Sequence, residues 1–453
     1  MAHKIRYFLA GLATVAVVAA GTVYLNFGEK AQLPFEAGVG PSPTLPQPVE
    51  TLLPTLKIAK AVGWSAGEVP DVPQGFRVEA LVRDLDHPRW LHILPNGDIL
   101  VAESDKPSVP DGAAGADPGI IGGIRQWVMG LVLSQVGAGT PSADRITLLR
   151  GLKADGSAEL RTVFMKDLAS PFGMALVGNE LFIANANAVV KVPYEEDQTE
   201  ITATPVKVTD LPAGINYHWT KNLIANADGS KLYVTVGSNS NAGENGLEIE
   251  EGRAAIWEVD VQTGEKRLFA GGLRNPNGLA WEPETGALWT VVNERDEIGS
   301  DLVPDYLTSV QDGAFYGWPW SYFGDHVDPR VEPARPDMVT KAIVPDYALG
   351  THVAALGLAF SDSRLMSADF AHGAFIGEHG SYNRNPKSGY KVVFVPFKDG
   401  RPNGDPIDFV TGFLDSEGNA RGRPVGVALD QQGALLVADD VGNIVWRVTP
   451  ASR

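Results

Sequence analysis

From residue 73 onward the chain alternates between short hydrophobic runs and turns, and one unit recurs along its length. In each copy a proline or polar residue precedes an apolar run, a turn follows, and a second apolar run ends in polar residues. Turns such as Pro95-Asn96-Gly97 and Asp228-Gly229 join two alternating runs, which predicts β-hairpins. The copies cover residues 87–104, 170–192, 218–241, 274–294, 352–381 and 423–448.

Six such units at unequal spacing predict an all-β fold, a six-bladed β-propeller with loop insertions. Each blade can bury its apolar faces only against its neighbours, so the ring must close. The loops at one rim then face a common axial pocket. We therefore expect the polar residues that open the repeats to gather there, namely His87, His218, Arg274, His352 and Arg423.

Two stretches interrupt the repeats. Residues 117–139 form an apolar run that contains Arg125 and Gln126, and a surface helix packed on the propeller is favoured over a helix that dips into a membrane. Residues 293–324 are rich in acids and aromatic side chains, which indicates an insertion that acts as a lid or a pocket wall.

The amino terminus predicts export. Lys4 and Arg6 precede residues 7–27, an uncharged run of apolar and small residues, so residues 1–27 read as a signal peptide or an uncleaved membrane anchor. Either way the body of the protein lies outside the cytoplasm, in the periplasm or beyond. Residues 28–72 are rich in proline and read as a linker, and residues 73–453 form the propeller domain.

Composition narrows the choice of ligand. The formal net charge of −18 argues against a nucleic-acid partner and favours a small molecule. The chain has no cysteine, which excludes disulfides and thiolate chemistry, and its eight histidines form no zinc-like pair at short spacing.

Three groups of residues can carry chemistry. His218 is a candidate general base or a structural histidine at the start of a repeat. Five cations suit a polyanionic small ligand, or else are solvated surface charges. They are Arg274, Arg384, Lys387, Arg421 and Arg423. The acids after Asn293 read as side-chain ligands for calcium, as a loop whose carbonyls bind calcium, or as a solvated acidic loop.

Several motifs together resemble a known family. They are HWTKNLIANADGSKLYVTVGSNSN, GGLRNPNGLAW, DGAFYGWPWSYFG, GEHGSYNRNPKSGYKV and RGRPVGVALDQQGALLVADD. In this order they resemble the pyrroloquinoline quinone (PQQ) dependent sugar dehydrogenases, and most closely the sorbosone or soluble aldose dehydrogenase branch. The resemblance spans about residues 73–450, and RNPxGLA followed by YGWP is its most specific part.

The resemblance implies a six-bladed propeller with PQQ over the channel and Ca²⁺ at the quinone. His218 would be the general base, and hydride would pass to the quinone, polarised by Ca²⁺ and Arg274. Four further residues match positions near the cofactor in the family: Asn275, Arg421, Arg423 and Asp440. The family's cofactor-contacting lysine aligns with Arg384 or Lys387. The substrate would be an aldose, an aldosone or a related sugar, with an external quinone or cytochrome as electron acceptor.

The sequence also departs from the glucose-oxidising branch. Ser238 and Asn239 replace the acid that orients the histidine, and Glu294 and Arg295 replace the Gly-Pro pair whose carbonyls bind calcium. Calcium remains an expectation, with main-chain oxygens of Glu294 and Arg295 and the Glu294 side chain as ligands. The sugar-contacting aromatic residues are open, with Tyr316, Trp318 and Tyr382 as candidates.

Two other functions fit the same fold. A lactonase-like, calcium-dependent hydrolase would need an axial cage, for which several strand-end residues qualify. A non-catalytic binding propeller is the other alternative. Arg274, Arg421 and Arg423 suit a tricarboxylate cofactor and have no evident use in a hydrolase. The possible cage residues are Glu103, Asn185, Asn239, Glu294, Glu378 and Asp440.

Overall fold

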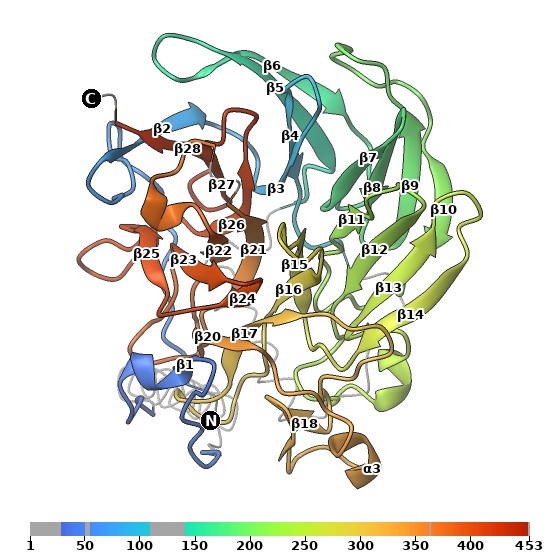
Figure 1. The fold of residues 1–453 in the computed structure, drawn as a ribbon, viewed down its shortest axis with the longest axis vertical. Coiled ribbons are helices and arrows are strands. Elements are labelled where there is room, and N and C mark those ends of the chain that lie inside the picture. Colours follow the sequence, from blue (N-terminus) through green and yellow to red (C-terminus); the bar gives the residue numbers. More distant parts are fainter. Residues whose placement is uncertain (1–28, 50–54, 109–140, 362–363, 452–453) are drawn as a thin grey trace, which may run out of the picture.

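A computed structural model describes residues 29–49, 55–108, 141–361 and 364–451. Six antiparallel sheets of at least four strands surround a common axis, and each inner strand lies near the centre of the ring (Figure 1). The six-bladed propeller expected from the repeats is therefore confirmed.

The first three blades follow the chain without a break, each from its inner to its outer strand. Blade 1 holds β3 (Pro88–Ile93), β4 (Ile99–Glu103), β5 (Arg145–Leu152) and β6 (Ala158–Met165). Blade 2 holds β7 (Met174–Val177), β8 (Glu180–Ala184), β9 (Ala188–Pro193) and β10 (Val206–Asp210). Blade 3 holds β11 (Leu223–Ala225), β12 (Lys231–Val236), β13 (Ala255–Asp260) and β14 (Lys266–Gly271).

The remaining blades use strands from distant parts of the chain. Blade 4 holds β15 (Pro276–Trp281), β16 (Leu288–Val292), β17 (Pro304–Ser309), β20 (Tyr347–Thr351) and, at its edge, β1 (Val39–Gly40). Blade 5 holds β21 (Ala355–Phe360), β22 (Gly373–Glu378), β23 (Lys391–Lys398), β25 (Ile407–Val410) and β24 (Arg401–Pro402). Blade 6 holds β26 (Pro424–Leu429), β27 (Leu435–Asp439), β28 (Ile444–Pro450) and β2 (Phe76–Val82).

Two features close the ring between blades 6 and 1. The outermost strand of blade 6 is β2, so the start of the propeller sequence pairs with β28 at its end. On the inner side, β26 lies so close to β3 that a Cβ on Gly426 would come within 2.7 Å of the main-chain oxygen of Arg89. Only glycine permits this approach, which explains the glycine in the RPVG motif of the last repeat.

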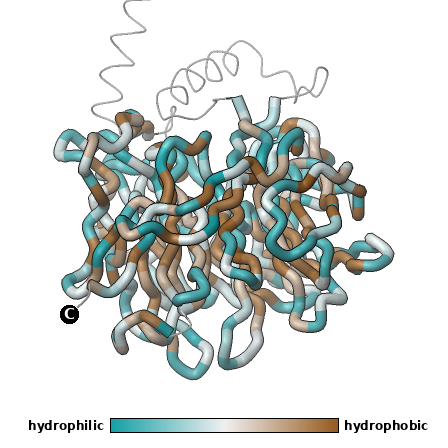
Figure 2. Tube along the Cα trace, turned by 90° about the horizontal axis from the view of Figure 1, so that it is seen from above, coloured by the Kyte–Doolittle hydropathy of each residue, from teal (hydrophilic) through white to brown (hydrophobic). Residues whose placement is uncertain are grey.

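The core is made of contacts between blades. Apolar side chains of adjacent sheets interdigitate in clusters such as the one joining Phe182 of β8 to Leu232 of β12. In the edge-on view, most hydrophobic segments follow the strands, and the loops beneath them are mainly hydrophilic (Figure 2). Each short apolar run is therefore buried only when its blade packs between two others.

Strand register places the polar residues at one rim. Because the strands are antiparallel, the start of each inner strand meets the end of the next strand, as in Pro88 opposite Glu103 and Pro424 opposite Asp439. The residues that open the repeats and those that end the second strands therefore share the same end of the channel. The expected clustering follows from this register.

The proline-rich segment, expected to be a linker, packs along this rim. The Gln32 amide donates to Asp301 at 2.6 Å, and the Val62 amide donates to the Ala420 carbonyl at 2.8 Å. The indole of Trp64 donates to Asp439 at 2.7 Å. Residues 29–49 and 55–72, hereafter the N-terminal strap, thus contact loops of blades 4, 5 and 6.

The acid-rich stretch 293–324 is not one insertion, because its residues 304–309 form β17, the third strand of blade 4. The additional chain lies between β17 and β20 and contains β18 (Ser321–Tyr322), β19 (His326–Val327) and the short helix α3 (Pro336–Val339). The helix expected over 117–139 and the export segment 1–27 lie outside the described residues. Within the described parts of the chain, no helix is both long enough and apolar enough to cross a membrane.

Buried carboxyl groups predict how stability depends on pH. Burial raises the pKa of Glu378 to about 8 and that of Asp439 to about 6, above their unfolded values of about 4. At these two groups the folded protein binds more protons than the unfolded chain, and the stabilisation that they provide is lost as pH rises through these pKa values. The lowered pKa values of His218 and His379 act in the opposite direction below about pH 6.5. We therefore expect Tm to fall between about pH 7 and about pH 8.5, measured by calorimetry.

The variant Glu378→Gln should flatten that dependence, because it removes the group with the higher pKa. A matched control is Glu195→Gln on an exposed loop, which should keep the parental slope. A Tm that rises with pH between these values, or the same slope in both variants, would contradict the assignment.

Candidate active site

His218 lies just before β11 with its ring largely buried. Its Nδ1 is 3.0 Å from both the carbonyl oxygen and the hydroxyl of Ser238. The Ser238 hydroxyl donates its proton to the Ser240 carbonyl at 2.7 Å, so toward His218 it can only accept. Both contacts therefore require the proton on Nδ1, which leaves a lone pair on Nε2.

The imidazole is also held neutral. Burial, and then the charge of Arg274, lower the pKa of His218 well below its usual value. A neutral ring with a fixed tautomer can accept a proton at neutral pH. Ser238 thus replaces the missing acid in orientation, although it does not add a negative charge that would raise basicity.

Gly237 lets His218 and Asn275 lie side by side. A Cβ at position 237 would come within 2.4 Å of Asn275 Oδ1 and 2.6 Å of His218 Cβ. Asn275 is buried, and its Oδ1 has no hydrogen-bond partner. The pair therefore presents an imidazole and an unsatisfied amide oxygen at one place.

Arg274 is buried, and all five of its N–H groups are in use. Nε donates to the Asn241 carbonyl at 3.0 Å, and Nη1 donates to the carbonyls of Asn293 and Glu294 at 3.2 and 2.6 Å. Nη2 donates to Asn241 Oδ1 at 2.9 Å and to Asp296 at 3.3 Å. A guanidinium has five donors, so this side chain fastens two loops together and acts on His218 through its charge.

Asp296 is the centre of a second set of contacts. Its carboxylate accepts from His352 Nδ1 at 3.2 Å and from the Tyr382 hydroxyl at 3.3 Å, besides Arg274. Although burial opposes it, these partners hold the pKa of Asp296 well below its usual value. His352 Nε2 faces the Gly299 carbonyl at 3.0 Å, so both ring nitrogens donate and this histidine is a cation that braces the loop.

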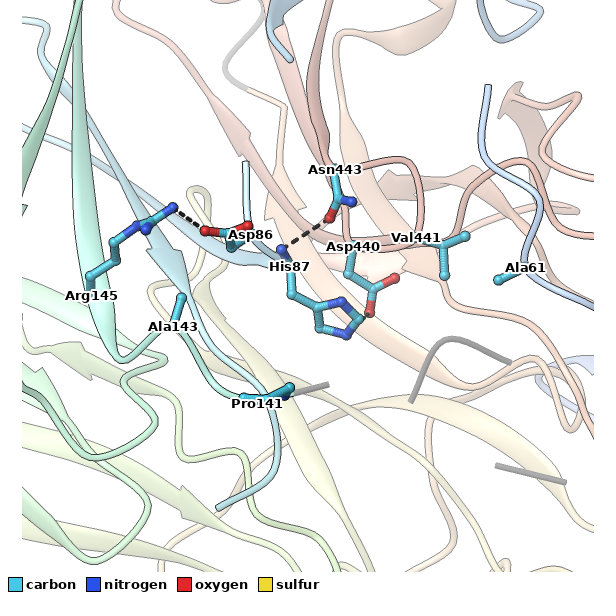
Figure 3. A pocket seen from close by; sticks show the side chains of 9 residues that line it. All are labelled: Ala61, Asp86, His87, Pro141, Ala143, Arg145, Asp440, Val441 and Asn443. Carbon is cyan, nitrogen blue, oxygen red and sulfur yellow. Dashed lines mark hydrogen bonds and ion pairs between the residues drawn. The ribbon is translucent and has the colours of Figure 1, made fainter. Parts of the chain in front are cut away.

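On the opposite side of the rim, Asp440 collects two imidazoles and a guanidinium. His379 Nε2 lies 2.9 Å from its carboxylate, His87 Nε2 lies at 3.6 Å, and Arg89 also binds it. Figure 3 shows the His87 ring beside Asp440, and the His87 amide donating to Asn443. A cavity of about 490 Å³ adjoins them, lined also by Asp86 and Arg145.

Arg423 and Lys387 are cations without an acidic partner in the described residues. Arg423 is buried, Nη2 donates to the Tyr390 hydroxyl at 3.1 Å, and Nε has no partner. Lys387 Nζ donates to the Gly418 carbonyl at 2.8 Å. Burial first, then the charges of Lys57 and Arg423, lower the pKa of Lys387.

The other two candidate cations point elsewhere. Arg384 is buried and donates to Ser300, Thr351 and Pro386, with the Phe35 ring below it. Arg421 is half-buried against Trp64 and lies 3.5 Å from Glu68. Of the two positions matched to the family's lysine, Lys387 therefore is the one that lies beside Arg423.

Glu294 and Arg295, the residues expected to bind calcium, differ in how their side chains are engaged. The carbonyl of Glu294 accepts from Arg274, while its side-chain Oε1 is buried without a partner. Burial raises the pKa of Glu294 to about 7. The Arg295 side chain is buried against Asp328 at 2.9 Å, away from the carbonyls of this loop, so only its main chain could bind a cation.

The cage expected for a hydrolase has no cluster of acids and histidines behind it in the described residues. In the part of the chain that the structure describes, no three His, Asp or Glu side chains gather as a metal site. Glu103, for example, is engaged by Arg145 at 2.7 Å and by Thr147. The Glu103 carboxylate is therefore occupied by hydrogen-bond donors and fixes the end of β4.

The aromatic residues considered for sugar binding are engaged in hydrogen bonds within the protein. Tyr316 is buried and donates to the Ser309 carbonyl, and the Trp318 indole donates to the Asn241 carbonyl. Tyr382 touches Asp296. An aromatic residue that sequence reasoning missed is Tyr217, which is 40% exposed with its ring 4.7 Å from that of His218.

Sequence reasoning did not select His379 and Arg89, although His379 stands inside a quoted motif and Arg89 lies two residues after His87. It considered Ser238 only as a replacement for an acid, and Asp296 only as one of the acids after Asn293. The partners of His379 and Arg89 were not visible, because they come from other blades. The carboxylate of Asp440, for instance, joins side chains of blades 1 and 5.

Comparison with known proteins identifies relatives. The TrAA12-like family model matches residues 146–306 and 337–451. The PQQ-dependent pyranose dehydrogenase of Coprinopsis cinerea is 23% identical over 72% of this chain, which spans 44% of that protein. The aldose sugar dehydrogenase YliI of Escherichia coli is 23% identical over 69% of this chain and 78% of its own length.

A solved structure supports the fold. The iodide structure of the Trichoderma reesei enzyme of carbohydrate-active family AA12 superposes with a TM-score of 0.67. It covers 84% of this chain and 98% of its own, at 19% identity. A calcium structure of the same family gives a TM-score of 0.66 at 18% identity, covering 84% of this chain and 97% of its own.

Gly237 provides a direct test of the site geometry. Gly237→Ala would force Asn275 and His218 apart, because real Cβ atoms do not approach within 2.4 Å of an oxygen. We expect a loss of about 1–3 kcal/mol in the free energy of unfolding, measured with urea. The control Gly271→Ala meets only a Leu268 methyl group at 3.7 Å and should cost less. Equal losses in both variants would contradict the close approach.

Proposed function

Because this chain belongs to the TrAA12-like family, we propose that it is a PQQ-dependent dehydrogenase that oxidises an aldose, an aldosone or a related sugar. The observation that carries the proposal is His218, fixed with its lone pair on Nε2 and set beside the unsatisfied oxygen of Asn275. A neutral base at the same rim as Arg423 and Lys387, which form no ion pair with a carboxylate in the described residues, suits oxidation of a hydroxyl beside a polyanionic cofactor.

The residues of this rim suit a polyanionic quinone. PQQ carries three carboxylates, and Arg423 and Lys387 are cations that have no carboxylate of their own in the described residues. The buried, unpartnered Nε of Arg423 is a donor that folding has left unsatisfied, which costs about 1–3 kcal/mol unless a ligand accepts it. Arg423 and Lys387 would hold carboxylates, and Asn275 would contact the ring system.

The chain's own part in the reaction is proton transfer and positioning. Nε2 of His218 removes the proton of the substrate hydroxyl, and its Nδ1–H stays on Ser238. When bound, PQQ supplies the two-electron acceptor for the hydride of the same carbon. Arg274 keeps the imidazole neutral before the reaction and fixes the loop that carries Glu294. Tyr217, exposed next to His218, offers an apolar face to a sugar ring.

Calcium is part of the proposal, and this chain offers it only part of a coordination shell. The loop carbonyls and the unpartnered Oε1 of Glu294 are hard oxygen donors, fewer than the six to eight that calcium takes. The cofactor and water would supply the rest. The calcium structure of a family AA12 enzyme supports the expectation.

We also propose that the enzyme works outside the cytoplasm and passes electrons to an external quinone or cytochrome. The basic residues Lys4 and Arg6 before the uncharged run 7–27 support export, with or without a retained tether. Cell fractionation after mild and alkaline washing distinguishes a soluble exported protein from an anchored one.

Reconstitution tests the function. Purified apoprotein should bind PQQ in the presence of CaCl₂, with a change in the cofactor's absorbance, and should then reduce a dye when sugar is added. His218→Ala should keep the affinity for PQQ and lower kcat by about 10²–10⁴, because only the base is lost. The control His326→Ala removes an exposed histidine and should keep activity. Failure of the parent protein to bind PQQ would end the proposal.

The pH dependence tests the base. Since the pKa of His218 is well below 6.5, kcat/KM should rise with pH only in the acidic range and be flat near neutrality. Asn239→Asp keeps the acceptor for the Tyr217 amide and adds a carboxylate near the ring, so the acidic limb should move to higher pH. Asn226→Asp, in a distant hairpin turn, should leave it in place. A limb above pH 7 in the parent would contradict the lowered pKa of His218.

A further inference from the structure

Three cations lie on neighbouring segments at the rim of blades 5 and 6. They are Lys57, Lys387 and Arg423, and in the described residues none forms an ion pair with a carboxylate. Asp415 is the one acid whose charge acts on Lys387, and its oxygens are taken by Asn419 and the Glu417 amide. In a chain with a net charge of −18, such a group is unexpected unless it serves a ligand.

The N-terminal strap fixes Lys57 between the two loops that carry the other cations. The Lys57 amide donates to the Tyr382 carbonyl at 2.7 Å, in the loop that leads to Lys387. Three residues on, the Lys60 carbonyl accepts from the Ala420 amide at 2.8 Å, in the loop that leads to Arg423. Lys387 spans the same gap, since its Nζ reaches the Gly418 carbonyl. Ala59 between the two anchors is completely buried, which holds this part of the strap down.

The electrostatics agree with this placement of the strap between the two loops. Burial, Lys57 and Arg423 all lower the pKa of Lys387, so the cations repel one another in the absence of an anion. Arg423 is 4% exposed, and its Nε finds no acceptor in the protein. Mutual repulsion and an unused buried donor are both relieved by one bound carboxylate.

We propose that Lys57, from the N-terminal strap, completes a carboxylate-binding cradle with Lys387 and Arg423 and holds one carboxylate of the cofactor. The inference rests on the proposed function for the identity of that carboxylate. It assigns a ligand-binding role to a segment that precedes residues 146–306 and 337–451, the two ranges that the family model matches. The strap is then part of the binding site as well as a tie across the blades.

The test is PQQ affinity of the apoprotein, measured by fluorescence or calorimetric titration with CaCl₂ present. Lys57→Ala should raise the Kd for PQQ about tenfold, since one charge-assisted contact is lost. Lys57→Arg should restore most of the affinity. The control Lys60→Ala removes the same charge from an exposed side chain three residues away and should leave Kd unchanged.

A second measurement separates ligand binding from a structural role. Without cofactor, Lys57→Ala should keep or raise the Tm, because it removes repulsion from Lys387 and Arg423, and the rise in Tm caused by PQQ should shrink. A lower apoprotein Tm with an unchanged Kd would overturn the proposal.

The outcomes also separate the two hypotheses. If the parent protein binds no PQQ, the proposed function fails. If the parent binds PQQ and Lys57→Ala binds it equally well, only the cradle fails. An unchanged Kd for PQQ with a raised KM for an acidic sugar would place the carboxylate on the substrate, and would overturn the assignment to the cofactor.

Discussion

Burial between blades is the interaction on which this structure depends. A single four-stranded sheet of this chain is apolar on both faces and too small to be stable alone, so each blade needs two neighbours. The ring must therefore close, and it does so with β2 on β28 outside and with Gly426 against β3 inside. Closure fixes the rim loops in space, and every functional contact described above is made between those loops.

The closed rim holds the His218 ring in one tautomer without a carboxylate beside it. His218 needs a fixed tautomer, which the Ser238 carbonyl and hydroxyl provide without a buried negative charge. The cost is basicity, because burial and Arg274 both disfavour the imidazolium. Arg274 in turn is held by main-chain oxygens and by Asp296, whose charge is balanced by His352. The site is thus a chain of paired charges that ends at a neutral imidazole.

The N-terminal strap lies against the same rim loops that carry the candidate site residues. Its proline content suits an extended chain, and that extended chain is what allows it to follow the rim across blades 4, 5 and 6 and contact a loop of each. Edge pairing of β1 with β20 and the Trp64 bond to Asp439 make it part of the fold. Residues that precede the repeats can therefore contribute to the same axial site as the repeats.

The sequence by itself determined the number of blades, the hairpins and the rim at which His218, Arg274 and Arg423 lie. These follow from local patterns, since the turn residues and the alternation of apolar side chains act within a few residues. Sequence motifs also selected Asn275 and Lys387. Only the tertiary structure decided that Arg274 has no free donor, that Arg295 turns to Asp328, and that Arg384 and Arg421 bind the strap side of the rim. It alone placed Lys57 of the strap between the loops that carry Lys387 and Arg423, more than three hundred residues away in the sequence. The reason is physical: a side chain's partners in a propeller come from other blades, and their distances are set by closure of the ring, which no local pattern encodes.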